Sequence, residues 1–177
     1  MKIILSSNSP RRKELLAGLG VDLEVRVLKG VDERYPDDIP LNEVPLYIAI
    51  EKASAYTVAK DELVVTADTV VIVDNEILGK PKDRAEAYGM LRKISGKTHQ
   101  VVTGVCLTTI DDQRSFTVTT DVEFKELSDN EIYYYIDKYR PFDKAGAYGI
   151  QEWIGYIGVT SLHGSYFNVM GLPVQRI

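Results

Sequence analysis

The chain has 177 residues, 45% of them hydrophobic and 27% charged, a composition that suits a globular domain. Its net charge of −5 argues against broad binding to nucleic acid, which depends on a basic surface. Cys106 is the single cysteine, so no disulfide can form within the chain, and no apolar run is long enough to span a membrane. We expect a cytoplasmic protein with one domain over 1–177, in one or two lobes.

The pattern of apolar residues predicts strands and helices that alternate at first, after which strands dominate. This order favours an α/β fold with a mixed sheet flanked by helices. Capping residues support two of the helices, namely Asp83 for one and Ser128 with Glu131 for another. In chain order we expect strand 2–6, helix 10–19, strand 23–28, helix 43–59, strand 62–73, a short strand ending at Gly79, helix 84–94, strands 98–110 and 114–125, helix 129–139 and strand 153–161.

The loop between the first strand and the first helix is the most informative segment of the chain. Ser9 is a typical N-cap, and Pro10 fits the first helical position, where its missing N–H costs nothing. A helix N-terminus directs free N–H groups and a positive dipole at one point, which favours anions. Ser7, Arg11 and Arg12 add donors suited to phosphate oxygens. A plain helix start with two solvated arginines explains the same residues about equally well.

Asp68 interrupts the apolar strand 62–73. A buried, unpaired carboxylate costs several kcal/mol, so we expect Asp68 at an exposed end of the strand or beside a cation. A salt bridge is one interpretation, and a metal ligand or a general base beside a water molecule is the other. Strand alternation places Asp68 and Thr69 on opposite faces, so the backbone must bend if both contact one ligand.

Other charged residues are candidates for binding a phosphate or a metal ion. Lys52 lies in the second helix and Lys80 in a turn stiffened by Pro81, and each could also be a solvated surface lysine. Glu33 follows the second strand and could join Asp68 as a hard oxygen ligand for Mg²⁺ or Mn²⁺. Cys106 lies among apolar residues, and we interpret it as part of the core.

Several short motifs gain meaning from their order and spacing along the chain. They are Ser7-Asn8-Ser9-Pro10-Arg11-Arg12, Glu51-Lys52-Ala53, Ala67-Asp68-Thr69, Gly79-Lys80-Pro81, the stretch 143–151, Gly164-Ser165-Tyr166 and Gly171-Leu172-Pro173. Together these motifs resemble the Maf family of nucleoside triphosphate pyrophosphatases. The resemblance covers essentially the whole chain, with one departure, since Asn8 stands where the family commonly has glycine or alanine.

The resemblance implies a fold, a reaction and a set of site residues. The fold is that of inosine triphosphate pyrophosphatases, a mixed, elongated sheet with helices and two lobes with a cleft between them, often as a homodimer. The reaction is hydrolysis of a nucleoside triphosphate to the monophosphate and pyrophosphate with a divalent metal. Asp68 would be the proton acceptor, and Lys52, Lys80 and Glu33 would lie at the phosphates and the metal.

The same resemblance implies a base preference. Arg12, Thr69 and Gln151 match the positions tied to it, and their identities are similar to those of the branch that acts on dTTP and UTP. Two alternatives stay open: a housecleaning pyrophosphatase for modified or other nucleotides, and a division-regulating or nucleic-acid-binding protein, because family members are linked to septum formation. The net acidity favours no nucleic-acid partner, and we expect no membrane partner.

Overall fold

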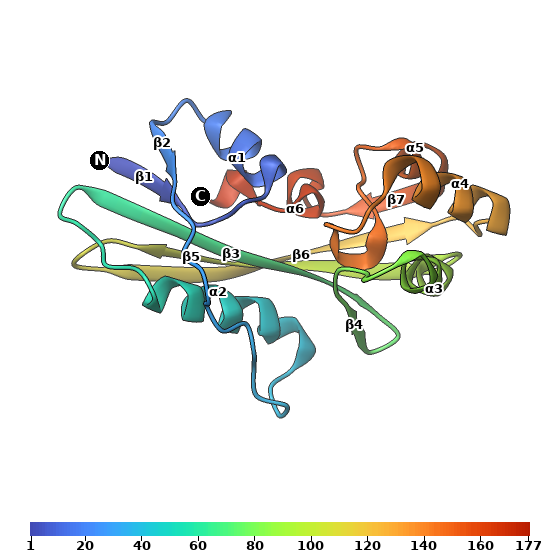
Figure 1. The fold of residues 1–177 in the computed structure, drawn as a ribbon, viewed down its shortest axis with the longest axis horizontal. Coiled ribbons are helices and arrows are strands. Elements are labelled where there is room, and N and C mark those ends of the chain that lie inside the picture. The colour runs from blue at the N-terminus through green and yellow to red at the C-terminus, as the bar shows by residue number, and fades with distance from the viewer. The chain divides into compact units, whose positions relative to one another are not determined.

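Seven strands form one mixed sheet in the computed structural model, which describes residues 1–177 (Figure 1). The spatial order is β2, β1, β3, β5, β6, β7, and β4 pairs with β3 outside this path. β1 runs parallel to β2 and β3, whereas β4 and β7 run antiparallel to β3 and β6, so the predicted mixed α/β sheet is confirmed. The strands are β1 (Lys2–Leu5), β2 (Leu23–Val25), β3 (Glu62–Val73), β4 (Glu76–Leu78), β5 (Thr98–Thr108), β6 (Gln113–Phe124) and β7 (Val159–His163).

Six α-helices and three short 3₁₀ segments complete the secondary structure. No helix combines the length and the apolar character needed to cross a lipid bilayer. The α-helices are α1 (Pro10–Ala17), α2 (Val44–Ser54), α3 (Arg84–Ile94), α4 (Asp129–Tyr139), α5 (Trp153–Gly158) and α6 (Tyr166–Met170), and the 3₁₀ segments are Leu41–Glu43, Ala145–Ala147 and Val174–Arg176.

The chain divides into two compact units, each with its own buried core. Unit 1 comprises Met1–Thr69, Val102–Val118 and Gly171–Ile177, and unit 2 comprises Val70–Val101 and Thr119–Met170. β3, β5 and β6 contribute residues to both units, so the boundary falls inside strands. Composition along the sequence therefore has no linker to mark this boundary.

In unit 1, alternate residues of β3 face α1 and α2. Val65 belongs to a buried cluster with Leu16 of α1, whereas the Thr66 hydroxyl donates to the carbonyl oxygen of Ala49 in α2 at 2.7 Å. Cys106 belongs to the cluster on the α2 side and is fully buried, which confirms its prediction as a core residue. Since a strand exposes successive residues on opposite faces, Thr66 and Asp68 face α2, whereas Val65, Ala67 and Thr69 face α1.

Gly104 allows α2 to pack directly on the backbone of β5. A Cβ atom at this position would lie 2.3 Å from the backbone nitrogen of Leu46, in the first turn of α2. Any side chain here would push the helix away from the sheet. The absence of a side chain on Gly104 therefore fixes the depth at which α2, and with it Lys52, approaches β3.

In unit 2, the predicted helix caps are confirmed. The Asp83 carboxylate accepts the N–H of Glu86 at 2.8 Å, and α3 begins directly after Asp83. Ser128 and Glu131 form the expected capping box at the start of α4, which spans the predicted residues. Reciprocal side-chain bonds satisfy N–H groups that a helix start otherwise leaves unpaired.

The prediction of a strand over 153–161 was wrong. Residues 153–158 form the short helix α5, and β7 occupies Val159–His163. The aromatic and β-branched residues of this stretch favour a strand, but a Cβ on Gly155 would lie only 1.8 Å from the Ile150 carbonyl oxygen. This close approach is available only to glycine, so a backbone contact within the segment outweighed the strand preference of its residues. The helix predicted over 43–59 also ends earlier, at Ser54.

We expect His99 to make the free energy of unfolding of unit 2 decrease in acid. Its side chain is buried in β5, with Nε2 2.5 Å from the Tyr148 hydroxyl oxygen, and burial lowers its pKa to about 4. An unfolded histidine has a pKa of about 6.5, so between these values only the unfolded state takes up the proton. We expect the free energy of unfolding to decrease by about 3 kcal/mol as the pH falls through this window.

Urea unfolding at a series of pH values measures this effect. The His99→Gln variant should lose most of the pH dependence in this window, whereas the same change at the exposed His163 should leave it unchanged. An equally steep acid dependence in His99→Gln would show that other groups cause it.

Candidate functional site

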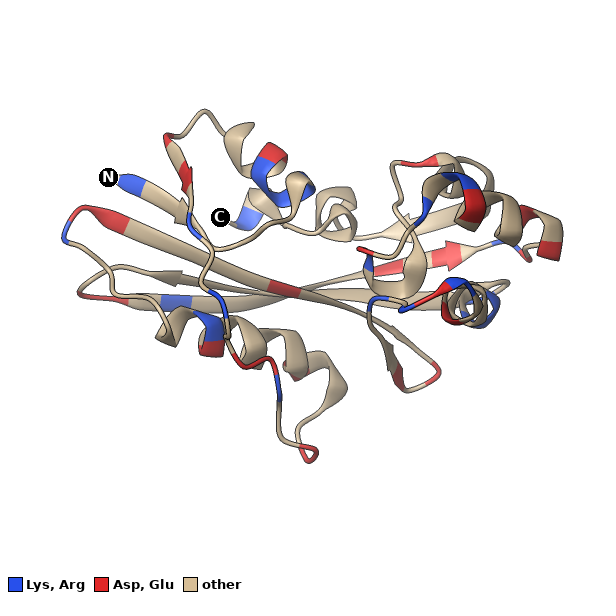
Figure 2. Cartoon of the chain, in the orientation of Figure 1, with Lys and Arg blue, Asp and Glu red and all other residues tan.

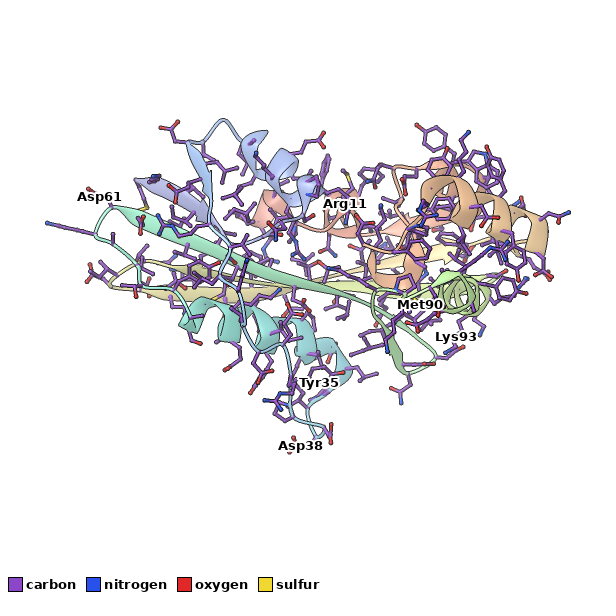
Figure 3. All side chains as sticks on the ribbon, in the orientation of Figure 1. Arg11, Tyr35, Asp38, Asp61, Met90 and Lys93 are labelled. Atoms are coloured by element: carbon purple, nitrogen blue, oxygen red, sulfur yellow. The ribbon has the colours of Figure 1, made fainter.

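The turn after β1 is held by serine side chains and leads into α1. The Ser7 hydroxyl accepts the N–H of Ser9 at 3.1 Å, and the Ser9 hydroxyl accepts the N–H of Arg12 at 3.3 Å. Ser9 is thus the N-cap and Pro10 the first helical residue, as predicted. Arg11 is half-buried in the first turn (Figure 3), so hydroxyls and an arginine lie at the positive end of this helix.

β1 ends before β3 does, which leaves a carbonyl group of β3 without a strand partner on that side. The last pair in the register is Leu5 with Val65, and the Val65 carbonyl still accepts the N–H of Ser6 at 3.1 Å. The next carbonyl on this edge belongs to Ala67, two residues further on. It accepts from Lys52 Nζ at 3.2 Å and from Arg12 Nη1 at 3.3 Å. Two cations, one from α2 and one from α1, therefore converge at the point where β1 stops.

On the α2 side of β3, Lys52 lies between two carboxylates. Its Nζ is 3.2 Å from Glu33 Oε1 and 3.6 Å from Asp68 Oδ1. The side chains of Lys52 and Asp68 are only 16% and 18% exposed, whereas Glu33 is 62% exposed on its loop. Burial raises the pKa of Asp68, and the charges of Lys52 and Arg12 oppose that rise. The result is a carboxylate that is more basic than a surface aspartate and still faces a cation.

On the α1 side of β3, the Arg12 guanidinium connects three segments of unit 1. Besides Ala67, it donates through Nε to the Gly171 carbonyl at 2.8 Å and through Nη2 to the Thr69 hydroxyl at 2.9 Å. The Thr69 hydroxyl oxygen lies 2.8 Å from that of Thr103 on β5. The alternation predicted for Asp68 and Thr69 therefore holds, since their side chains have partners from different helices. Figure 2 shows basic residues on both helices, α1 and α2.

Lys80 and Gln151 belong to unit 2, where a backbone hydrogen bond joins the segments that carry them. Lys80 is exposed directly after Gly79, and the Gly79 carbonyl accepts the N–H of Gly146 at 3.1 Å. Gly146 and Ala147 both have positive φ angles, 73° and 63°, and the second is uncommon for a residue with a side chain. The side-chain oxygen of Gln151 is buried and has no hydrogen-bond partner within the protein.

Known proteins match this chain over nearly its whole length. The profile of a family described as Maf-like protein matches residues 2–177. The chain belongs to the Maf family. A protein of Phocaeicola vulgatus named dTTP/UTP pyrophosphatase is 64% identical over 178 residues, covering 99% of this chain and 92% of that protein. Proteins of the same name from Bacteroides thetaiotaomicron and Porphyromonas gingivalis are 61% and 55% identical, covering 99% of this chain and 92% and 90% of their own lengths.

In this Maf family member, unit 1 brings together most of the residues that the sequence singled out. Asp68, Lys52 and Glu33 lie on one face of β3, and Arg12 and Thr69 lie on the other. Ser7, Ser9 and Arg11 lie in the turn and first helical turn that lead to Arg12.

Sequence reasoning missed several groups that hold these side chains in place. Thr103 is a fully buried polar residue in an apolar strand, the same signal that drew attention to Asp68. The carbonyl groups of Ala67 and Gly171 carry no signal in the sequence, because every residue has one. The sequence also gives no sign of the role of the Tyr135 hydroxyl, which makes hydrogen bonds to the segment that carries Gln151.

Proposed function

We propose that this protein hydrolyses dTTP and UTP to the monophosphate and pyrophosphate. The observation that carries the proposal is the convergence of Lys52 and Arg12 on the Ala67 carbonyl, beside the buried carboxylate of Asp68. Cations held at a strand end next to a basic carboxylate suit attack by water on a polyphosphate. The dTTP/UTP pyrophosphatase name of relatives up to 64% identical supports the same reaction.

Asp68 is the proton acceptor in this proposal. Its raised pKa, caused by burial, strengthens it as a base for a water molecule that attacks the α-phosphorus. The positive charge of Lys52 favours the ionised form of Asp68. During the reaction it stabilises the negative charge that develops on the phosphates. The cation of Arg11 and the hydroxyls of Ser7 and Ser9 bind the remaining phosphate oxygens. A role for Lys80 at the phosphates stays a prediction from the sequence.

The donor chemistry of Asp68 and Glu33 fits a divalent cation such as Mg²⁺ or Mn²⁺. Both offer hard carboxylate oxygens, and both lie around the same ammonium group of Lys52. No three His, Cys, Asp or Glu side chains gather as a preformed metal site. Two carboxylates suffice for Mg²⁺ when water and substrate phosphates supply the other ligands. When bound, such an ion would neutralise phosphate charge and orient the triphosphate.

The base preference in this proposal comes from Gln151, Thr69 and Arg12. The amide of Gln151 has a donor and an acceptor, which match the O4 and N3–H of uracil or thymine. Cytosine carries the opposite pattern, a donor at position 4 and an acceptor at N3. An amide oriented to pair with uracil would therefore face donor with donor and acceptor with acceptor. A homodimer and a cytoplasmic location stay predictions from the sequence.

A panel of nucleoside triphosphates with Mg²⁺ or Mn²⁺ tests the proposal through the products released. We expect pyrophosphate and the monophosphate from UTP and dTTP, with turnover at least about tenfold above that of CTP and the purine triphosphates. Modified pyrimidine triphosphates in the same panel test the housecleaning alternative. Release of inorganic phosphate in place of pyrophosphate, or no release from any member, would rule the proposal out.

A further inference from the structure

In unit 2, the hydroxyl of Tyr135 spans the turn that carries Gln151. It accepts the backbone N–H of Gly149 at 2.9 Å and lies 2.6 Å from Glu152 Oε1, to which it donates its proton. The N–H of Glu152 also donates to the Gly149 carbonyl at 3.0 Å. Residues 149 and 152 are thus joined through one phenolic oxygen, with Gln151 between them.

The surroundings of this turn leave it little room to move. Tyr135 is fully buried on α4, so its ring position is set by the core of unit 2. A Cβ on Gly149 would lie 2.7 Å from Glu152 Oε1 and 2.9 Å from Lys144 Cε. Lys144 Nζ also lies 3.7 Å from Glu152 Oε1. The side chains of Glu152, Lys144 and Tyr135 therefore all pack against the turn at Gly149.

The turn follows a strained segment that would relax without such support. Ala147 has a φ of 63°, a conformation that costs energy for a residue with a Cβ and persists only where neighbours impose it. The side-chain oxygen of Gln151 is buried without a partner, so it is an acceptor that only a ligand or water could satisfy.

We propose that Tyr135 is a positioning residue for base selection, whose hydroxyl holds the 149–152 turn so that the Gln151 amide meets the pyrimidine base. This inference rests on the proposed function and adds to it a residue that does not itself touch the substrate. The hydroxyl acts as acceptor and donor at once, so removing its single oxygen breaks both connections while the ring still fills the core.

The Tyr135→Phe variant tests this role through selectivity. We expect KM for UTP and dTTP to rise about tenfold, with kcat within about threefold of the wild type. Loss of both hydrogen bonds of the phenol would let Gln151 shift away from the base and would leave the groups that bind the phosphates in place. The kcat/KM for CTP should stay within about twofold, so the ratio of UTP to CTP falls about tenfold. Hydrogen exchange should show faster exchange at the Gly149 amide in the variant.

Two further variants separate positioning from general destabilisation. Tyr139 lies on the same helix and its hydroxyl makes no hydrogen bond. Tyr139→Phe should therefore change neither the UTP to CTP ratio of kcat/KM nor hydrogen exchange at the Gly149 amide. Glu152→Ala removes the acceptor of the phenol from a partly exposed site and should lower the same ratio, which keeps the test valid if Tyr135→Phe does not fold.

The outcomes distinguish this inference from the proposed function. If the wild type releases pyrophosphate selectively from UTP and Tyr135→Phe keeps that selectivity, the role of Tyr135 is overturned and the function stands. Equal losses for UTP and CTP would also overturn it, since they indicate a structural defect. If the wild type does not prefer uracil and thymine to cytosine, the base selectivity and this inference fall together.

Discussion

Asp68→Asn is expected to lower pyrophosphate release from dTTP and UTP by about a thousandfold, because an amide cannot take the proton of the attacking water. The change keeps the size and shape of the side chain, and Lys52 retains Glu33 and the Ala67 carbonyl as partners. Turnover is measured as pyrophosphate released at saturating substrate. Near-wild-type turnover would exclude Asp68 as the base.

The same variant should be at least as stable as the wild type. Burial raises the pKa of Asp68, so the folded state disfavours the ionised form more than the unfolded state does. As the pH rises from the ordinary pKa of an aspartate through this raised value, the wild type loses stability, and an amide does not titrate. Thermal unfolding at neutral pH should therefore give an equal or higher Tm. The matched control is Asp61→Asn, at an exposed residue just before β3 (Figure 3), which should change neither activity nor Tm.

Lys52→Gln is expected to lower turnover about 100-fold, because it removes a preorganised charge that faces both Asp68 and the phosphates. Lys52 makes the largest contribution that holds down the pKa of Asp68. Without it that pKa rises further, and the acid limb of the kcat/KM profile should move to higher pH.

The pH profile distinguishes this role of Lys52 from simple substrate binding. The control Lys60→Gln changes an exposed lysine of the same unit and should leave both turnover and the profile unaltered. A Lys52→Gln enzyme with a higher KM and an unmoved acid limb would show that Lys52 binds substrate without influencing Asp68.

Much of the secondary structure could be read from residues with local effects. Strand 62–73 and helix 129–139 have the predicted bounds, because β-branched residues and a complete capping box act within a few positions. The error at 153–158 arose because strand preference was taken residue by residue. There, Gly155 approaches the carbonyl of Ile150, a backbone contact that the preferences of single residues do not reveal.

The sequence by itself determined the mixed α/β class and, through motif order, the family, because caps, periodicity and spacing are written in neighbouring residues. It also pointed to Asp68 as a polar residue that an apolar strand would not hold without a partner. Only the tertiary structure decided which partners it has. Lys52 and Arg12 meet at Ala67 because β1 stops at Leu5, opposite Val65, and leaves the Ala67 carbonyl without a strand partner. Thr69 meets Thr103 because β3 and β5 are neighbours. Those contacts join residues far apart in the chain, and strand ends and strand order are set by the packing of the whole sheet.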